Sequence, residues 1–129
     1  MNRTDNPYHV ECEDREYKAR DLQNGFKSRT GGIQFNWCPR KMRSESGQRR
    51  MDQLEKHLRE HGMINPLITY DGHVLIGMRR FEIMSEIMGD DWIVPCIEVL
   101  EDIHSWTSKD VTRFQNWKTY LYGDSAPAC

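Results

Sequence analysis

The spacing of apolar residues divides the chain into short elements. Ile33–Trp37 alternates apolar and polar side chains, which predicts a half-buried strand that ends before Pro39 and joins a central sheet. Between residues 46 and 61 the apolar positions recur at helical spacing, and Gly62 follows as the expected stop. The side chains on this helical face are Met51, Leu54 and Leu58. The segment therefore predicts an amphipathic helix.

Residues 66–70 and 73–76 flank Asp71-Gly72, a dipeptide favoured in two-residue hairpin turns because both turn positions need a positive φ. They predict two antiparallel strands. Apolar spacing then predicts a helix over 79–88 and a strand over 92–100. The last element is a helix over 108–121, whose expected inward side chains are Val111, Phe114, Trp117 and Leu121.

Both ends of the chain are polar. Residues 1–32 contain Asn-Gly and Gly-Gly breakers, so we expect a loosely ordered N-terminal arm with little core and one short helix over Glu13–Leu22. Residues 33–122 are the expected domain and 123–129 a flexible tail. The order of elements predicts an α/β (α+β) fold, a small mixed sheet of about four strands with a β-hairpin, flanked by about three helices.

Length and composition restrict the class of protein. The chain has 129 residues, a hydrophobic fraction of 37% and a net charge of −2, which suits one domain with a compact core. No apolar run approaches the roughly 20 residues that cross a bilayer, and the polar start lacks a secretory signal. These features predict a cytoplasmic protein with no membrane partner. The four cysteines are scattered and are expected to be free thiols, with Cys96 buried.

Basic and acidic residues are separated along the chain. Residues 26–50 hold seven Lys or Arg against one acid, whereas residues 82–104 hold seven acids and no Lys or Arg. One interpretation is two solvated surfaces, and the other is a basic surface that steers a polyanion. In the second interpretation an aromatic ring beside the cations stacks on bases. This basic rim consists of Trp37, Arg40, Lys41, Arg43, Arg49 and Arg50.

The start of the helix expected at residue 79 carries the residue types of a phosphate site. A short apolar strand delivers Gly77, Met78, Arg79 and Arg80 to this point. Free backbone N–H groups, the positive end of the helix dipole and two guanidinium groups meet there, and all three attract anionic oxygen. Cations oppose the dipole at a helix N-terminus, which favours a functional use of these arginines.

Two other patterns concern metal ions. Residues 57–61 match His-x-x-Glu-His, the inverted zincin pattern, which we reject because Gly62 ends the helix directly afterwards. Asp90, Asp91 and Glu98 are weak candidates for holding a divalent cation, since phosphodiester cleavage commonly uses carboxylates to position metal ions. Acid pairs in loops are usually solvated turns, so we assign no metal site.

Several short motifs, in this order, resemble the ParB/sulfiredoxin superfamily, in particular the ParB-like N-terminal domain. The resemblance spans residues 47–100 and rests on a helix ending at Gly62, then Asn65-Pro66-Leu67, Asp71-Gly72, Ile76-Gly77-Met78-Arg79-Arg80 opening a helix, and Val94-Pro95-Cys96. It implies that the Gly77–Arg80 turn wraps a phosphate or nucleotide, with Asn65 and Pro66 beside it. Stand-alone modules of this kind are carried by phages and mobile elements.

Members of this superfamily bind or hydrolyse nucleotides, clamp DNA during chromosome or plasmid partition, or are described as ParB-like nucleases. The resemblance therefore implies a nucleotide or DNA as ligand. If the chain is a hydrolase that acts on a nucleotide or a DNA phosphodiester, the expected cofactor is Mg²⁺ or Mn²⁺, because such cleavage commonly uses metal ions. Whether the chain is an enzyme stays open.

Met78 departs from the family pattern. ParB proteins have Glu at this place and sulfiredoxins have their catalytic Cys, so Met78 argues against sulfinic reductase chemistry and weakens the case for CTP hydrolysis. The second ParB nucleotide motif, Glu-Asn-x-x-Arg, and a helix-turn-helix domain are not found. An alternative is a non-catalytic protein that binds a host or partner protein through the acidic residues from Glu82 to Asp102 or through the last helix. A homodimer also stays open.

Overall fold

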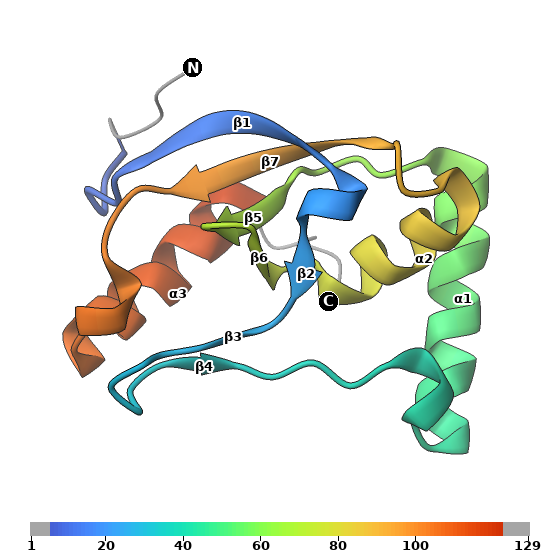
Figure 1. Ribbon diagram of the computed structural model, residues 1–129, viewed down its shortest axis with the longest axis horizontal. Coiled ribbons are helices and arrows are strands. Elements are labelled where there is room, and N and C mark those ends of the chain that lie inside the picture. Colours follow the sequence, from blue (N-terminus) through green and yellow to red (C-terminus); the bar gives the residue numbers. More distant parts are fainter. Residues whose placement is uncertain (1–5, 123–129) are drawn as a thin grey trace.

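The computed structural model describes residues 6–122, and the tail expected over 123–129 lies outside them (Figure 1). The predicted mixed α/β class is confirmed: a five-stranded sheet, a two-stranded sheet and three α-helices. The strands are β1 (Cys12–Lys18), β2 (Gln23–Asn24), β3 (Phe26–Lys27), β4 (Gln34–Phe35), β5 (Leu67–Tyr70), β6 (His73–Ile76) and β7 (Ile93–Val99). The helices are α1 (Glu45–His61), α2 (Met78–Met88) and α3 (Ser108–Tyr122), with the short 3₁₀ turns η1 (Ala19–Asp21), η2 (Arg40–Met42) and η3 (Ile103–Ser105).

The larger sheet has the order β1-β7-β5-β6-β2. The predicted hairpin is confirmed, since β5 and β6 pair antiparallel and the turn residues Asp71 and Gly72 have φ of 48° and 80°. Strands β5 and β7 pair parallel, and the crossover between them contains α2. The hairpin thus delivers the chain directly from β6 into α2. No helix among residues 6–122 has the length and apolar character that a bilayer crossing requires.

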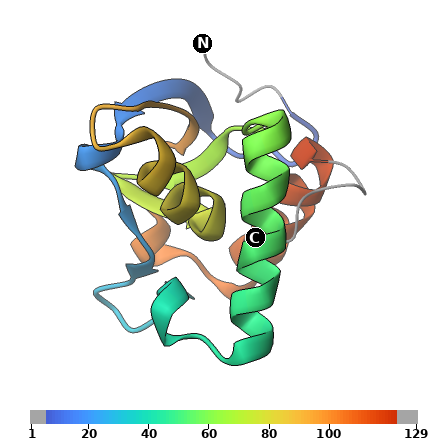
Figure 2. The ribbon, with the colours of Figure 1, turned by 90° about the vertical axis from the view of Figure 1, so that its right-hand side faces the viewer.

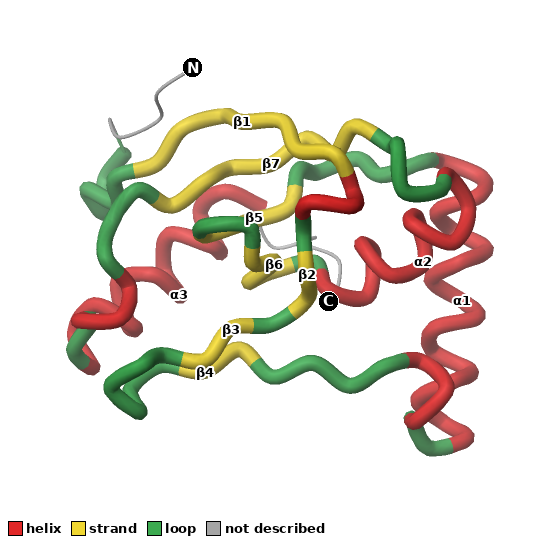
Figure 3. Tube along the Cα trace, viewed as in Figure 1, coloured by secondary structure: helices red, strands yellow, loops and turns green. Residues whose placement is uncertain are grey.

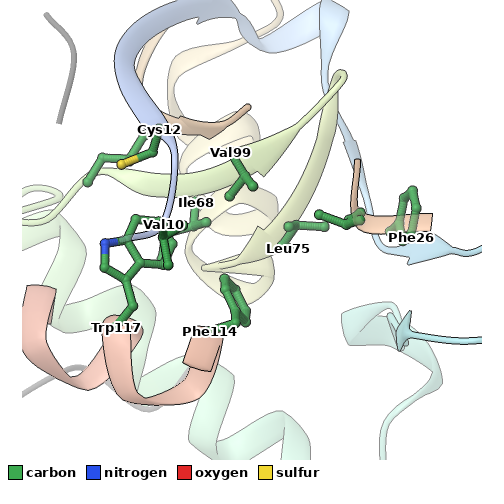
Figure 4. Close-up of a cluster of buried hydrophobic side chains, with 10 residues drawn as sticks. Val10, Cys12, Phe26, Ile68, Leu75, Val99, Phe114 and Trp117 are labelled. Carbon is green, nitrogen blue, oxygen red and sulfur yellow. The ribbon is translucent and has the colours of Figure 1, made fainter. Parts of the chain in front are cut away.

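The helices cover the two faces of the sheet in different ways. Helix α3 packs on one face, where the fully buried Phe114 and Trp117 meet Ile68 and Val99 (Figure 4). Helix α2 covers the opposite face through Phe81. Helix α1 packs on α2, and the two helices share a cluster of Met51, Leu58, Ile83 and Met84. As a result α1 and α2 lie together on one side of the sheet, away from α3 (Figure 1).

The expectation of a loosely ordered N-terminal arm is wrong for the described residues. The segment expected as a helix over Glu13–Leu22 is instead β1, which pairs antiparallel with β7 along its whole length, followed by η1. Val10 and Cys12 are fully buried in the main core. The sequence did not predict this strand because β1 is rich in charged residues and lacks an alternating apolar pattern. Charged residues on an edge strand commonly prevent edge-to-edge association.

Ile33–Trp37 was expected in the central sheet, and this expectation is also wrong. Only β4 forms there, and it pairs with β3 in a separate two-stranded sheet, which lies apart from the main sheet in Figure 3. The half-buried character comes from packing instead. The Phe35 ring meets the Phe114 ring edge to face, with centroids 5.6 Å apart. The alternating pattern therefore predicted the half-buried side chains of this segment correctly, but it did not predict that its strand pairs with β3.

Glu101 joins three separate segments of the chain. Its carboxylate accepts hydrogen bonds from the Arg113 guanidinium of α3 at 2.5 and 3.0 Å, from the N–H of Glu11 at 2.9 Å and from the indole of Trp106 at 3.2 Å. Burial alone would raise the pKa of Glu101, but these hydrogen bonds and the charge of Arg113 outweigh it and lower the pKa.

We expect Glu101→Gln to lower the free energy of unfolding by about 2 kcal/mol at neutral pH. Because the folded-state pKa of Glu101 lies below its unfolded-state pKa, this stabilisation is fully present above the unfolded-state pKa and is lost as the pH falls through the folded-state pKa. Urea denaturation at about pH 7 and pH 3 should therefore show a smaller difference at the acidic pH. Glu16→Gln, on exposed β1, is the control. An equal cost at both pH values would contradict this account of Glu101.

Candidate functional site

The first turn of α2 has the backbone geometry predicted for an anion site. Gly77 adopts a left-handed conformation with φ of 97°, and the helix begins at Met78 with no side-chain cap. The first helical hydrogen bond runs from the N–H of Phe81 to the carbonyl of Gly77 at 2.8 Å. The N–H groups of the three preceding residues thus have no acceptor within the helix, and they lie at the positive end of its dipole.

Glycine is required at position 77 for a second reason. A Cβ at this position would lie 2.4 Å from the Cδ2 of Leu67 and 2.9 Å from a terminal nitrogen of Arg80. Leu67 is fully buried, so it has little room to move away. The close approach therefore holds the start of α2 directly against β5.

The structure places Arg80 in the core, where only 2% of the residue is exposed. Its Nη1 donates to the carbonyl of Asn65 at 2.7 Å, and its guanidinium lies 5.7 Å from the centre of the Tyr122 ring. The Tyr122 hydroxyl donates to the carbonyl of Pro66 at 2.7 Å. Asn65 and Pro66 do lie beside Arg80, as expected, but their carbonyls hold side chains of the protein. Arg80 therefore contributes to the packing of the fold.

Arg79 has a different environment from its neighbour. It is half-buried and forms no ion pair with any residue in the range 6–122. In a helix, residues three and seven positions ahead share its face, which places Arg79 on the same side of α2 as Glu82 and Glu86. That is the side covered by η2, because the N–H of Arg40 donates to both carboxylate oxygens of Glu82 at 3.2 Å. Arg79 therefore lies toward the basic rim.

Met78 contributes its backbone and an apolar side chain to this turn. Its carbonyl accepts a hydrogen bond from the Nδ2 of Asn24 at 3.0 Å, and its side chain packs against the cluster that contains Leu22 and Val74. Asn24 thus joins β2 to the start of α2. Sequence reasoning missed Asn24, because Asn-Gly dipeptides in a polar segment indicate a turn and give no sign of a long-range contact.

Arg40 is the internal anchor of the basic rim. Its guanidinium pairs with Asp52 at 2.5 Å and Glu55 at 2.6 Å on α1, and lies 3.6 Å from Glu86 on α2. The hydrogen bonds to Glu55 and Asp52 raise the pKa of Arg40. Arg40 therefore fixes η2 between the two helices and has little charge to offer a ligand.

The other members of the rim belong to η2, the residues beside it and the first two turns of α1. Figure 2 shows the short η2 turn beside the start of α1. The Arg43 guanidinium lies 5.3 Å from the centre of the Trp37 ring, and its Nε donates to the carbonyl of Cys38 at 3.0 Å. Arg49 pairs with Glu45 at 3.2 Å across an exposed helical turn, an arrangement that contributes little stability. Lys41 and Arg50 are exposed and form no ion pair with a described residue. Trp37, Arg40, Lys41 and Arg43 thus lie around η2, whereas helical spacing directs Arg50 away from the side of α1 that meets η2.

An open hollow of about 460 Å³ separates η2 from α2. Its lining combines the rim with the acidic side of α2 and consists of Pro39, Arg40, Lys41, Gln48, Glu82 and Glu86. The carboxylates of Asp52 and Glu55 lie further along α1. Because acidic side chains of α1 and α2 border the hollow, the basic residues on this side lie only at the end of the molecule that contains η2 and the start of α1.

The weak metal candidates are not brought together. Glu98 is 4% exposed and accepts hydrogen bonds from Thr69 at 2.6 Å, Tyr17 at 3.0 Å and the N–H of Asp71 at 2.7 Å. Asp90 and Asp91 are exposed, and Asp91 pairs with an arginine of η1. Within residues 6–122 no three His, Cys, Asp or Glu side chains are grouped to hold a metal ion. Glu98 instead joins β1, β5 and β7.

Two remaining sequence patterns have structural explanations. The rings of His57 and His61 lie 4.8 Å apart on the exposed side of α1. Cys96 is a buried free thiol, as predicted, and burial raises its pKa to about 12. Cys38 is also a free thiol, Cys12 is buried in the main core, and Cys129 lies outside the described residues. A thiol with so high a pKa is a poor nucleophile near neutral pH.

Comparison with known proteins identifies the fold. No family model matches the chain, and no curated protein matches its sequence. Among solved structures, a Pnob8-like ParB-N domain matches 91% of this chain with a TM-score of 0.52 and 17% sequence identity. The chain spans 40% of the length of that protein. It therefore has a ParB-N-like fold, which the motifs between residues 47 and 100 predicted.

Proposed function

We propose that this protein binds the phosphodiester backbone of a nucleic acid across the first turn of α2, η2 and the first turns of α1. One observation carries the proposal. Cations without an ion pair to a described residue come from three neighbouring elements, beside N–H groups that have no acceptor within α2. Lys41 and Arg43 lie on or next to η2, Arg79 lies on the side of α2 that meets η2, and Arg50 lies near the start of α1.

A polymer explains this arrangement better than a single phosphate does. The cations come from two helices and the turn between them, so they form an extended surface that follows several phosphates. The Trp37 ring beside Arg43 supplies an aromatic face next to this surface. Arg40 neutralises the nearby carboxylates of α1, which reduces their repulsion of a polyanion. The ParB-N-like fold supports a nucleic-acid or nucleotide ligand.

Arg79→Ala tests the proposal. We expect about tenfold weaker binding of fluorescein-labelled DNA of roughly 20 base pairs, measured by fluorescence anisotropy, because one phosphate contact is lost. The slope of log affinity against log salt concentration should fall by about one. Arg59→Ala is the matched control, since Arg59 is an exposed arginine that pairs with Glu55 near the opposite end of α1. Equal affinity in wild type and Arg79→Ala would overturn the proposal.

Hydrolysis and a protein partner are separate predictions. Incubation of plasmid DNA or nucleoside triphosphates with Mg²⁺ or Mn²⁺ tests hydrolysis, and activity that disappears in Arg79→Ala would assign it to this site. Competition of nucleoside triphosphates with labelled DNA distinguishes a nucleotide ligand from a polymer. A stable protein complex that forms through the acidic residues of α2 and is not displaced by DNA would favour the alternative, a non-catalytic protein that binds a partner protein.

A further inference from the structure

The most exposed large apolar side chains of the described residues include Met42, at 71%. Met42 ends η2 and lies between Lys41 and Arg43 in the chain. A single exposed apolar side chain is common on a protein surface and does not by itself indicate a ligand. Met42 differs in standing between two cations on the surface that we propose for a nucleic-acid backbone, where a ligand with apolar base faces between anionic phosphates would meet all three residues.

The turn that carries Met42 is held rigidly. The N–H of Met42 donates to the carbonyl of Pro39 at 3.0 Å, and that of Arg43 donates to the carbonyl of Arg40 at 3.2 Å. Arg40 is fixed to α1 and α2 by its ion pairs and by the hydrogen bonds from its N–H to Glu82. On the other side of the turn, the Nε2 of Gln48 donates to the carbonyl of Arg43 at 3.1 Å. The exposed side chain thus projects from a support fixed to two helices.

We propose that Met42 inserts between stacked base pairs of duplex DNA while Lys41 and Arg43 contact the flanking phosphates. This inference rests on the proposed function and specifies its ligand as a duplex. Apolar side chains, including Met, are known to enter the minor groove, unstack one base step and bend the duplex. The minor groove is about 6 Å wide, and Lys41 and Arg43, the chain neighbours of Met42, are the cations that would contact its two phosphate strands.

The rigid η2 turn lowers the entropic cost of inserting Met42. Separating one base step costs a few kcal/mol, and a flexible loop would lose further entropy on insertion. A side chain held on a rigid turn avoids most of that second cost. Among the described residues the Arg43 guanidinium donates only through its Nε, so its terminal nitrogens can donate to a phosphate.

The test uses duplexes that carry 2-aminopurine beside a TA step, the type of step that unstacks most easily. The fluorescence of 2-aminopurine rises when its stacking is lost, and an end label reports binding by anisotropy in the same sample. We expect wild-type protein to raise the 2-aminopurine signal about threefold at saturation. Met42→Ala should lose most of this rise while its affinity changes by less than about threefold. Met88→Ala, a second exposed methionine at the far end of α2, should behave as wild type.

The two readouts distinguish the possible failures. If wild type binds the duplex without a change in 2-aminopurine fluorescence, or if Met42→Ala gives the same rise, the insertion is overturned and the backbone-binding proposal stands. If wild type binds no DNA by anisotropy, both are overturned. Binding to vesicles of phosphatidylserine and phosphatidylcholine that depends on Met42, without a response from the duplex, would assign the same residues to an anionic membrane and also overturn the insertion.

Discussion

Gly77→Ala is expected to lower the free energy of unfolding by about 3 kcal/mol. Two costs combine in this value. A residue other than glycine pays roughly 1–2 kcal/mol at the left-handed φ of 97°. The new methyl group must also displace the buried Leu67 side chain, which it would approach to 2.4 Å. Urea denaturation of the two proteins measures the difference directly.

Gly31→Ala is the control for this prediction. Gly31 also has a positive φ, of 75°, but a Cβ there would meet nothing within 4 Å. It should therefore pay only the conformational cost, about 1 kcal/mol. If both variants lost the same stability, the close contact between Gly77 and Leu67 would have no energetic weight, and the position of α2 against β5 would need another explanation.

Arg80→Ala is expected to lower the free energy of unfolding by about 3 kcal/mol. The substitution removes a buried side chain, leaves the carbonyl of Asn65 without its donor at 2.7 Å and withdraws the cation from the Tyr122 ring. A cavity and a lost hydrogen bond from a charged donor both contribute. Thermal and urea denaturation should show this loss in the absence of any ligand.

The neighbouring residue provides the comparison. Arg79→Ala removes the same charge from a half-exposed position without an ion pair to a described residue, so its unfolding free energy should stay within about 0.5 kcal/mol of wild type. Arg80→Met fills part of the volume and should recover part of the lost stability. An Arg80→Ala protein as stable as wild type would show that Arg80 is not held in the core.

Local patterns predicted the elements that depend on neighbours in the chain. The Asp71-Gly72 turn requires positive φ at two consecutive positions, which few other dipeptides supply, and the hairpin formed as expected. Helix α1 ends at Gly62, whose N–H donates to the carbonyl of Leu58 and whose positive φ of 71° turns the chain out of the helix. Helix α3 buries Phe114 and Trp117 as predicted, whereas Val111 and Leu121 are only half-buried.

Long-range contacts could not be predicted in the same way. Strand β1 is a charged edge strand, and its membership of the sheet depends on β7, almost eighty residues later in the chain, so no local pattern indicates it. Arg79 and Arg80 are adjacent in the sequence, so the motif alone did not show that one is buried and the other is half-buried. Helical spacing does place Arg80 on the face of Ile83, Met84 and Ile87, which was the available signal that this arginine points inward.

The central claim is that a nucleic-acid backbone lies across η2 and the starts of α1 and α2. The most direct test is an NMR titration of ¹⁵N-labelled protein with unlabelled duplex DNA, in which every backbone amide reports its own environment. The account predicts that the largest chemical-shift changes fall on residues 38–50 and 77–82, while α3 changes little. Changes concentrated on α3 or β1, or none at a DNA concentration of about 1 mM, above the usual range of non-specific dissociation constants, would contradict it.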